Sequence, residues 1–353
     1  MLMINNQGGI KMPFSYIQEM PSPKEIFMDI PVPKDLVEVK KQRDAEIKRI
    51  FEGNSDKFLL IIGPCSADNE DAVCNYVERL AKIQETVKDQ IVIIPRIYTN
   101  KPRTTGEGYK GMLHQPNPSE ASNLFEGIKA IRNMHIRVMK ESHLTCADEM
   151  LYPENYAYLD DILSYVAIGA RSVENQQHRL TVSGIDVPVG MKNATSGDIS
   201  IMLNAIKAAQ IEHTFIFRGW EVGTDGNPLA HAILRGAVNQ YGTNIPNYHY
   251  EDLVAVIEHY EKRQLMNPAI IIDTNHANSN KKYKEQPRIA REILDNRTYD
   301  KKLKKYIKGL MVESYIVGGA QQIGDNVYGK SITDPCIGWE ATHKMIYEIA
   351  ARV

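Results

Sequence analysis

The chain has 353 residues, of which 43% are hydrophobic and 24% are charged, and its formal net charge is only −2. Such a chain can bury a large core, and its near-neutral charge excludes an overall field that would favour nucleic acid or an anionic membrane as a partner. The N-terminus MLMINNQGGIKM lacks the apolar core of a signal peptide, and no stretch approaches the roughly eighteen apolar residues of a transmembrane helix, so we expect a cytoplasmic protein.

The four cysteines are Cys65, Cys74, Cys146 and Cys336. Their spacing is neither close nor regular, unlike the spacing in the disulfide frameworks of small secreted domains. We therefore expect free thiols in a reducing compartment.

Residues 1–57 differ from the rest of the chain. Scattered prolines precede a charged run of helical character, KDLVEVKKQRDAEIKRIFEGN. Ser22, Pro23 and Glu25 resemble a helix start with a cap, a first-turn proline and a capping-box acid. We interpret this segment as an arm that precedes a single domain of residues 58–353. A regulatory arm, an oligomer-forming arm and a surface extension without a specific role all remain open.

From residue 58 onwards, short β-rich runs recur between helical stretches. Near-continuous runs of Val, Ile and Leu are typical of parallel strands that are buried on both faces. The eight runs are 58–66, 91–98, 136–142, 166–171, 187–193, 231–236, 269–278 and 309–317. Eight strands that alternate with helices predict an α/β fold of the (β/α)8 or TIM barrel type.

One segment departs from this alternation. Residues 213–230, HTFIFRGWEVGTDGNPLA, contain two strand-like runs around Asp225, Gly226 and Asn227. The pattern predicts a β-hairpin inserted before the sixth barrel strand.

Each predicted strand ends near a polar or charged residue. These residues are, in chain order, Cys65, Arg96, Glu141, Arg171, Lys192, Arg235, His276 and Glu313. In a barrel of this kind the C-terminal ends of the strands form one mouth, and active sites lie there. Each run is apolar up to that point and then switches to a residue that can bind a metal or an anion. This repeated switch favours a functional site over ordinary polar residues of solvent-exposed loops.

Several of these residues are cationic. The set comprises Arg96, Arg171, Lys192 and Arg235, joined by Lys101, Arg103 and Lys110 of the loop KPRTTGEGYKG. Arginine offers a planar fork for carboxylate and phosphate, and lysine offers a movable point charge. A single arginine could equally form a surface salt bridge, but the whole set in one cleft indicates a polyanionic substrate.

A second group has the chemistry of metal ligands. Its members are Cys65, His276 and Glu313, joined by Asp334 just after the last strand. A thiolate, an imidazole and two carboxylates suit one divalent transition metal, Mn, Fe, Co, Zn or Cu, better than Mg or Ca, and we favour Mn. These residues lie far apart in the sequence. They would come together only if the barrel closes and sets the first strand beside the eighth. Taken singly, Cys65 could be a small buried hydrophobe and His276 a core histidine.

These residues lie in segments that resemble a known family. The segments are IIGPCS (61–66), KPRTTGEGYKG (101–111), GARSVENQQHR (169–179), PVGMKN (188–193), ILRG (233–236), NHANSNKKY (275–283), VESYIVGGAQ (312–321) and YGKSITDPCIGWE (328–340). They resemble the type I 3-deoxy-D-arabino-heptulosonate 7-phosphate (DAHP) synthases, in the subfamily of enteric bacteria and yeast that is sensitive to phenylalanine, tyrosine or tryptophan. The resemblance implies condensation of phosphoenolpyruvate with D-erythrose 4-phosphate and water, the first step of the shikimate pathway to aromatic amino acids.

The resemblance also implies residue roles. The metal ligands would be Cys65, His276, Glu313 and Asp334. Phosphoenolpyruvate would be held by Arg96, Lys101, Arg171, Lys192 and Arg235, with Glu141 beside them. Erythrose 4-phosphate would be received by Lys101, Pro102, Arg103 and Thr104. The candidates for proton transfer are Lys101, Lys192, His276 and Glu141.

The resemblance further implies a homodimer or homotetramer, with the arm crossing between subunits, and a feedback pocket for an aromatic amino acid. That pocket would border residues 142–156 and 184–190, where Asp186 stands in place of the small polar residue that usually helps line it. Between Glu141 and Arg171 the chain is several residues longer than the enteric enzymes.

Two alternative functions remain. A related synthase condenses phosphoenolpyruvate with arabinose 5-phosphate to give 3-deoxy-D-manno-octulosonate 8-phosphate, but the KPRT motif (101–104) differs from that family's KANRSS. A non-catalytic barrel that binds metabolites would not need the intact set of ligands and cations.

Overall fold

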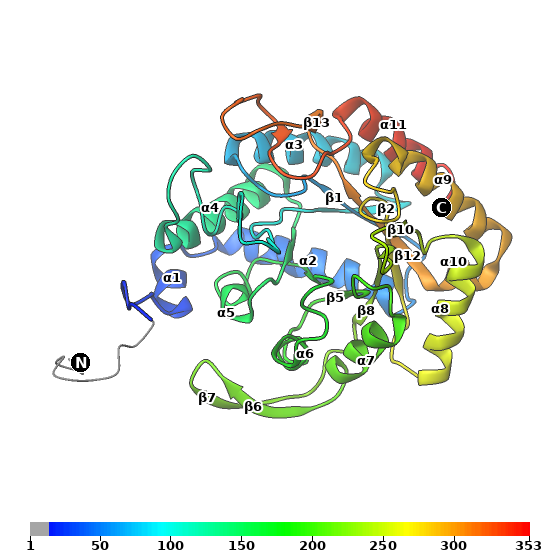
Figure 1. Cartoon of the computed structure of the whole chain (residues 1–353), viewed down its shortest axis with the longest axis horizontal. Coiled ribbons are helices and arrows are strands. Elements are labelled where there is room, and N and C mark those ends of the chain that lie inside the picture. The colour runs from blue at the N-terminus through cyan, green and yellow to red at the C-terminus, as the bar shows by residue number, and fades with distance from the viewer. Residues whose placement is uncertain (1–13) are drawn as a thin grey trace.

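A computed structural model of the chain describes residues 14–353 and contains a closed parallel barrel (Figure 1). Its eight strands are β1 (Phe58–Gly63), β2 (Ile91–Pro95), β3 (Ala147–Glu149), β4 (Tyr165–Ile168), β5 (Val189–Lys192), β8 (Ala230–Leu234), β11 (Ile270–Asp273) and β12 (Ile307–Glu313). They pair in the order β2-β1-β12-β11-β8-β5-β4-β3, and a parallel bridge between Arg96 and Ala147 joins β2 to β3. The predicted TIM barrel is confirmed, and its first and last strands are neighbours.

The strands are buried on both faces, as their continuous apolar runs predict. In β1, Leu59 and Ile61 belong to one hydrophobic cluster, whereas Leu60 and Ile62 belong to another. This alternation follows from the twofold repeat of a strand, which sends successive side chains to opposite faces. One cluster therefore fills the barrel interior, and the other packs between strands and helices.

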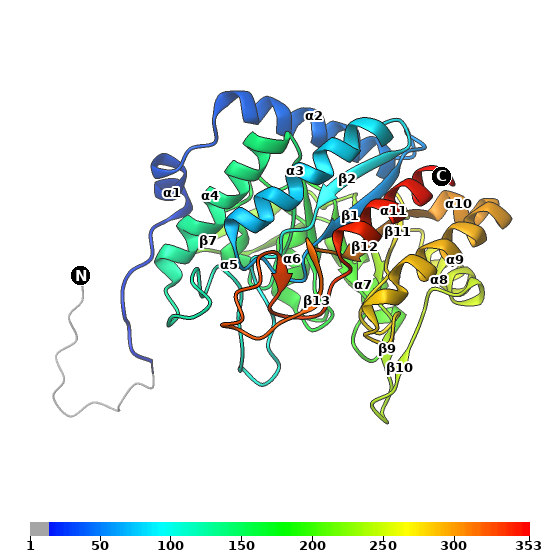
Figure 2. The same cartoon turned by 90° about the horizontal axis from the view of Figure 1, so that it is seen from above.

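Ten helical segments follow the arm and surround the barrel (Figure 2). They are α3 (Glu70–Val87), α4 (Leu124–Ser142), α5 (Pro153–Tyr156), α6 (Gln176–Val182), α7 (Ile199–Ala209), α8 (Tyr250–Arg263), the 3-10 helix η1 (Tyr283–Glu285), α9 (Gln286–Tyr299), α10 (Lys301–Tyr306) and α11 (Trp339–Ala350). Side-chain caps from Asn69, Asn123, Asn175 and Asp198 satisfy free amides at the starts of α3, α4, α6 and α7.

The N-terminal segment contributes α1 (Pro23–Asp29) and α2 (Lys34–Phe51). The predicted capping box is present, because the Ser22 side chain accepts from the Glu25 amide and the Glu25 carboxylate accepts from the Ser22 amide. At the end of α2, Phe51 joins the interior cluster and stacks on His231, with ring centroids 4.4 Å apart. The arm therefore contributes to the core of the barrel.

The predicted third strand, residues 136–142, is wrong: this segment forms the last two turns of α4. Buried positions such as Ile128, Ile131 and Val138 recur at helical spacing, so the whole run packs one face against the barrel. The true third strand, β3, has only three residues and too short a pattern to stand out in the sequence.

The predicted hairpin before the sixth barrel strand is confirmed, as β6 (His213–Phe217) paired with β7 (Trp220–Thr224). Its turn lies at Arg218 and Gly219, both at positive φ (54° and 81°), and not at residues 225–227 as predicted. Two consecutive left-handed residues match the twist of a two-residue hairpin. Two smaller pairs are β9 (Ala237–Val238) with β10 (Asn244–Ile245), and β13 (Val317–Ala320) with β14 (Lys330–Ser331).

The four cysteines are free, as expected, and all four are buried. Within residues 14–353, no helix combines the length and the apolar character needed to cross a membrane.

Candidate active site

A cleft of about 380 Å³ opens at the C-terminal ends of the barrel strands. Its lining includes nearly all of the residues singled out from the sequence: Cys65, Arg96, Lys101, Pro102, Arg103, Thr104, Arg171, Lys192, Arg235, His276, Glu313 and Asp334. Residues more than 250 positions apart thus share one cavity because the parallel strands all end at the same rim.

Glu141 does not belong to this cleft, and its assignment to a strand end is wrong. It lies in the last turn of α4, is exposed, and accepts a hydrogen bond from Arg137 Nε at 2.8 Å. Glu149, at the end of β3, lines the cleft instead, with Oε2 3.8 Å from Lys192 Nζ. The helical spacing of apolar residues continues to Ser142, and this signal could have placed the predicted third strand after residue 142.

A potential metal-binding group lies on one side of the cleft. Ligand atoms of Cys65, Glu313 and Asp334 all lie within 4.8 Å of one another. The Lys101 ammonium donates to Cys65 Sγ at 2.7 Å and to Asp334 Oδ2 at 2.6 Å. The thiol and the carboxylates therefore already gather around a positive charge, and this donor set fits a divalent transition metal.

His276 lies next to this group. Its Nε2 is 3.9 Å from Glu313 Oε1, and its Nδ1 is 2.8 Å from Asp273 Oδ2. The Asp273 carboxylate thus lies behind the imidazole, an arrangement common behind metal-binding histidines. Its backbone has a φ of 49°, which turns the chain at the end of β11.

Burial and close charges perturb the ionisable groups of the cleft. Burial, reinforced by the Glu313 carboxylate, raises the pKa of the Cys65 thiol to about 11. The neighbouring Lys101 ammonium holds the pKa of Asp334 well below its usual range. Burial lowers the pKa of Lys192, although Glu149 and Asp273 oppose the shift. Strongly perturbed groups gathered in one cleft are typical of functional sites.

The arginines are held in different ways. Arg96 is buried, donates from Nη2 to Glu313 Oε1 at 3.0 Å, and its guanidinium lies 3.6 Å from the centre of the Tyr98 ring. Arg235 lines the cleft with Nη1 buried and without a hydrogen-bond partner in the described part of the chain. A buried donor of this kind favours an anionic ligand, because desolvation without a partner costs about 1–3 kcal/mol.

The KPRT loop is tied to the barrel rim. Arg103 Nε donates to the carbonyl oxygen of Tyr109 at 2.8 Å, and the Tyr109 hydroxyl donates to the carbonyl oxygen of Ala67 at 2.8 Å. Gly108 has a φ of 84° and lies against the Arg103 guanidinium, where a side chain would crowd it. Lys110 does not line the cleft, so the prediction that it joins the other cations is wrong.

Known proteins are similar to this chain over most of its length. Residues 35–346 match the model of the DAHP synthetase I family. The chain is 35% identical over 345 residues to the phospho-2-dehydro-3-deoxyheptonate aldolase of Haemophilus influenzae, covering 96% of this chain and 92% of that protein. It is 36% identical to the Phe-sensitive enzyme of the same name from Escherichia coli K12, covering 96% of this chain and 95% of that protein.

A solved structure of phospho-2-dehydro-3-deoxyheptonate aldolase from Francisella tularensis is also similar. It superposes with a TM-score of 0.88 at 31% identity and covers 98% of both chains. The matches extend over both the barrel and the arm, and they favour the condensation with a four-carbon sugar over the two alternatives. The chain therefore belongs to the DAHP synthetase I family and is a DAHP synthase, the enzyme of the first step of the shikimate pathway.

Proposed function

We propose that this DAHP synthase binds its two substrates in the two halves of the cleft. Arg96, Lys101, Arg171, Lys192 and Arg235 bind the carboxylate and phosphate of phosphoenolpyruvate. Lys101, Pro102, Arg103 and Thr104 receive erythrose 4-phosphate. The observation that carries the proposal is that these cations line one cleft, in which Arg235 Nη1 has no hydrogen-bond partner among the described residues.

The metal site is the second part of the proposal. Cys65, His276, Glu313 and Asp334 would hold one divalent transition metal, and we favour manganese. The close approach of thiol and carboxylates supports this set, as does the imidazole at its edge. When bound, such an ion would act as a Lewis acid that polarises the aldehyde oxygen of the sugar phosphate.

In the reaction, C3 of phosphoenolpyruvate attacks the aldehyde carbon, water adds at C2, and phosphate leaves with cleavage of its C–O bond. Lys101, which belongs to both proposed half-sites and whose ammonium lies beside Cys65 and Asp334, would protonate the developing alkoxide. Lys192, whose pKa is lowered by burial, and Glu149, 3.8 Å away, are the pair through which a proton of the attacking water could pass. Glu149 replaces Glu141 in this role.

The test of the two half-sites is Arg103→Ala. We expect the KM for erythrose 4-phosphate to rise by about tenfold or more, because one charge-assisted contact to phosphate contributes about 1.5–3 kcal/mol. The KM for phosphoenolpyruvate should change by less than about twofold, since Arg103 is not among the cations proposed to hold it. Steady-state kinetics with each substrate varied in turn checks this. Equal changes in both constants would contradict the division.

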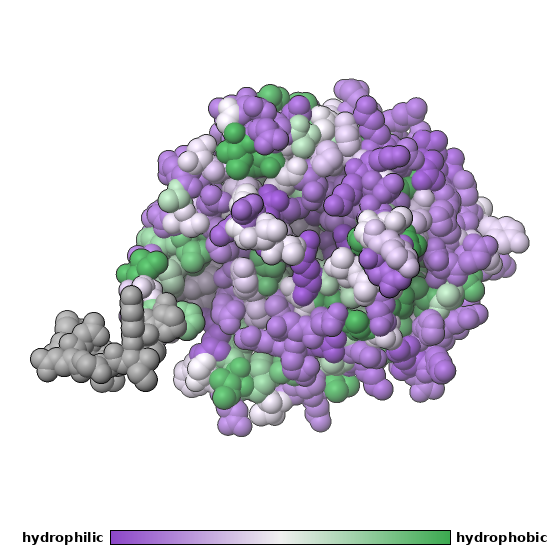
Figure 3. All heavy atoms as spheres, viewed as in Figure 1, coloured by the Kyte–Doolittle hydropathy of each residue, from purple (hydrophilic) through white to green (hydrophobic). Residues whose placement is uncertain are grey.

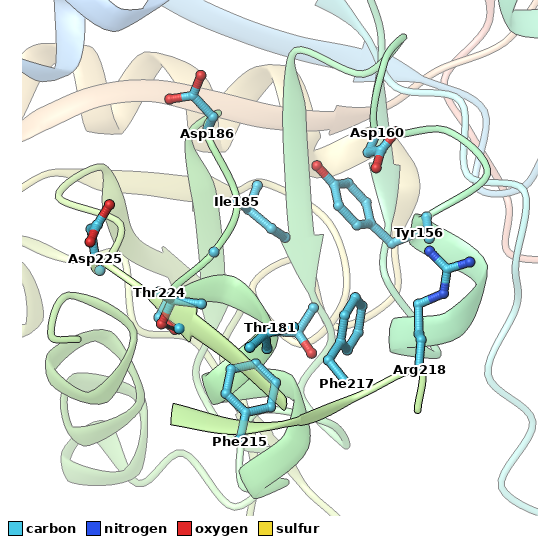
Figure 4. Close-up of a pocket in the computed structure, with 16 residues that line it drawn as sticks. Tyr156, Asp160, Thr181, Ile185, Asp186, Phe215, Phe217, Arg218, Thr224 and Asp225 are labelled. Atoms are coloured by element: carbon cyan, nitrogen blue, oxygen red, sulfur yellow. Dashed lines mark hydrogen bonds between the residues drawn. The ribbon is translucent and has the colours of Figure 1, made fainter. Parts of the chain in front are cut away.

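A second cavity supports feedback control. It has a volume of about 500 Å³, lies outside the barrel between α5, α6 and the β6–β7 hairpin, and includes Asp186 (Figure 4). The rings of Phe215 and Phe217 line it, with centroids 6.1 Å apart, together with Asp160 and Arg218. Relatives from Escherichia coli and Salmonella typhimurium carry the names Phe-sensitive and Tyr-sensitive. We propose that an aromatic amino acid inhibits this chain from here, its ring on the phenylalanines and its ammonium facing a carboxylate.

Inhibition should depend on pH through Asp160. Burial raises the pKa of Asp160 to about 6, reinforced by Asp161 and opposed by Arg218 and Arg132. The carboxylate is therefore neutral below that value and negative above it, so binding of an ammonium strengthens as pH rises. We expect the inhibition constant to fall by about three- to tenfold between pH 5 and pH 7.

Inhibition curves with phenylalanine, tyrosine and tryptophan across this pH range check the prediction. Asp160→Asn should weaken inhibition at pH 7 and flatten the profile, whereas Asp89→Asn, outside the cavity, should leave both unchanged. A profile that is identical in wild type and Asp160→Asn would refute the role of this carboxylate.

A homodimer or homotetramer is also proposed. The β6–β7 hairpin exposes Ile216 (78%) and Trp220 (75%), and the arm exposes Tyr16 and Ile17. Figure 3 shows hydrophobic side chains gathered over the hairpin at the lower edge of the molecule. Large apolar side chains left in solvent are typical of surfaces that bind a partner. The four buried free thiols support a cytoplasmic location.

A further inference from the structure

A third cavity, of about 450 Å³, lies at the end of the barrel opposite the active site. Its lining residues lie at the N-terminal ends of β1, β11 and β12, within 51–57, 267–268 and 301–308, together with Arg297 of α9. These three strands are neighbours in the sheet, so their N-terminal ends meet. No proposed role in catalysis or feedback uses this cavity.

The walls of this cavity are strongly basic. Six cations line it, namely Lys57, Arg297, Lys301, Lys304, Lys305 and Lys308, and the only carboxylates among its lining residues are Glu52 and Asp56. Lys57 is already paired with Glu46, at 2.8 Å. In a chain whose net charge is −2, the cavity therefore holds a local excess of positive charge that favours an anion.

Arg297 is the central observation. It is only 6% exposed, it lines the cavity from the end of α9, and its Nε has no hydrogen-bond partner among the described residues. Burial alone lowers its pKa to about 10, with no contribution from an acidic neighbour. Residues 1–13, which the structure does not describe, contain no Asp or Glu that could supply one.

The neighbours of Arg297 add to its need for an anion. Its guanidinium lies 4.5 Å from the centre of the Phe58 ring, which fixes its position without neutralising it. Burial and the charge of Arg297 both lower the pKa of Lys308, and Asp56 opposes the shift. Two like charges held together in a partly dry cavity are stabilised when an anion lies between them.

We propose that this basic cavity is a binding site for a small molecule that carries a phosphate group, separate from the substrate site. The phosphate contacts Arg297 and Lys308, and the lysines of α10 surround it. Arginine matches a phosphate with a planar fork, and mobile lysines add point charges. The cavity also has apolar walls at Phe51, Pro268 and Ile307, against which the organic part of such a molecule can pack.

The probe is pyridoxal 5′-phosphate, whose aldehyde condenses with a lysine amine to an imine with loss of water. Borohydride then reduces the imine to a stable secondary amine, and peptide mass spectrometry identifies each labelled lysine in the wild-type holoenzyme. Pyridoxal, which lacks the phosphate, serves as the matched reagent, so that intrinsic lysine reactivity cancels in the ratio of the two rates. Because labels are mapped by residue, reaction at Lys101 or Lys192 in the active site is counted separately.

We expect Lys305 or Lys308 to react at least about tenfold faster with the phosphate form than with pyridoxal, as one charge-assisted phosphate contact would give. Lys82 and Lys344, exposed on other helices, should show a much smaller ratio. Inorganic phosphate should protect the cavity lysines, and chloride at equal ionic strength should not. The same ratio at Lys305, Lys308, Lys82 and Lys344 would overturn the proposal.

Two variants sharpen the result. Arg297→Gln should lower the ratio at the cavity lysines towards that at Lys344. Since Arg297 packs on Phe58 and its loss could unfold the chain, Lys301→Gln combined with Lys304→Gln changes only exposed side chains and should lower the ratio as well. Both folded variants should keep DAHP synthase activity within about twofold of wild type, because the cavity lies at the other end of the barrel.

Discussion

Cys65→Ala is expected to lower kcat/KM by more than about 100-fold and to prevent retention of the metal. The Cys65 thiol is buried, and it is the only sulfur in the group formed with Glu313 and Asp334. Loss of residues that merely support a metal ligand commonly costs 10- to 100-fold, and loss of a ligand itself should cost more. Metal analysis after dialysis should find about one ion per wild-type chain and less than about a tenth of one in the variant.

Cys74→Ala is the matched control, because Cys74 is an equally buried cysteine on α3, outside the cleft. It should retain both metal and activity, with at most a modest loss of thermal stability. The circular dichroism spectrum of Cys65→Ala should match that of wild type. Full activity of Cys65→Ala in chelator-treated buffer would show that the metal assignment is wrong.

Lys192→Met is expected to lower kcat/KM by about 10²- to 10⁴-fold, the range typical for the loss of a residue that moves a proton. Lys192 is buried at the end of β5, 3.8 Å from both Glu149 and Asp273, and the methionine keeps its length without its charge. The loss of a cation beside two carboxylates should also weaken phosphoenolpyruvate binding, so that KM rises while kcat falls. Initial rates measured over both substrates separate the two effects.

Two comparisons make this prediction specific. Lys110→Met removes an exposed lysine of the KPRT loop that does not line the cleft, and it should change activity by less than about twofold. Glu149→Gln should lower kcat markedly, whereas Glu141→Gln, on the surface of α4, should not. If Glu141→Gln were the more damaging of the two glutamate changes, the placement of β3 would be wrong.

Much of the fold could be predicted from local pattern. The continuous apolar runs at 58–63 and 91–95 mark buried parallel strands, because only a strand covered on both faces needs apolar residues at every position. The capping box at Ser22 was also predictable, because all of its partners lie within four residues.

Other features could not be read from such patterns. The predicted strand at residues 136–142 contains the β-branched residues Ile136 and Val138 yet completes a helix, because burial of one face of α4 against the barrel outweighs local propensity. β3 has three residues and leaves almost no periodic signal, so Glu149 was missed. The hairpin turn was misplaced because Asp225-Gly226 and Arg218-Gly219 are both acceptable turn sequences, and only the pairing of Phe217 with Trp220 decides between them.

The sequence by itself determined the identity of the chemical groups: a thiol, an imidazole, carboxylates and a set of cations placed after apolar runs. Only the tertiary structure decided which of these groups lie in contact with one another. Cys65 approaches Asp334 because β1 pairs with β12 when the barrel closes, and Arg297 lies on the Phe58 ring because the end of α9 packs beside the start of β1. Such contacts depend on the register and closure of the whole sheet, which no short stretch of residues encodes.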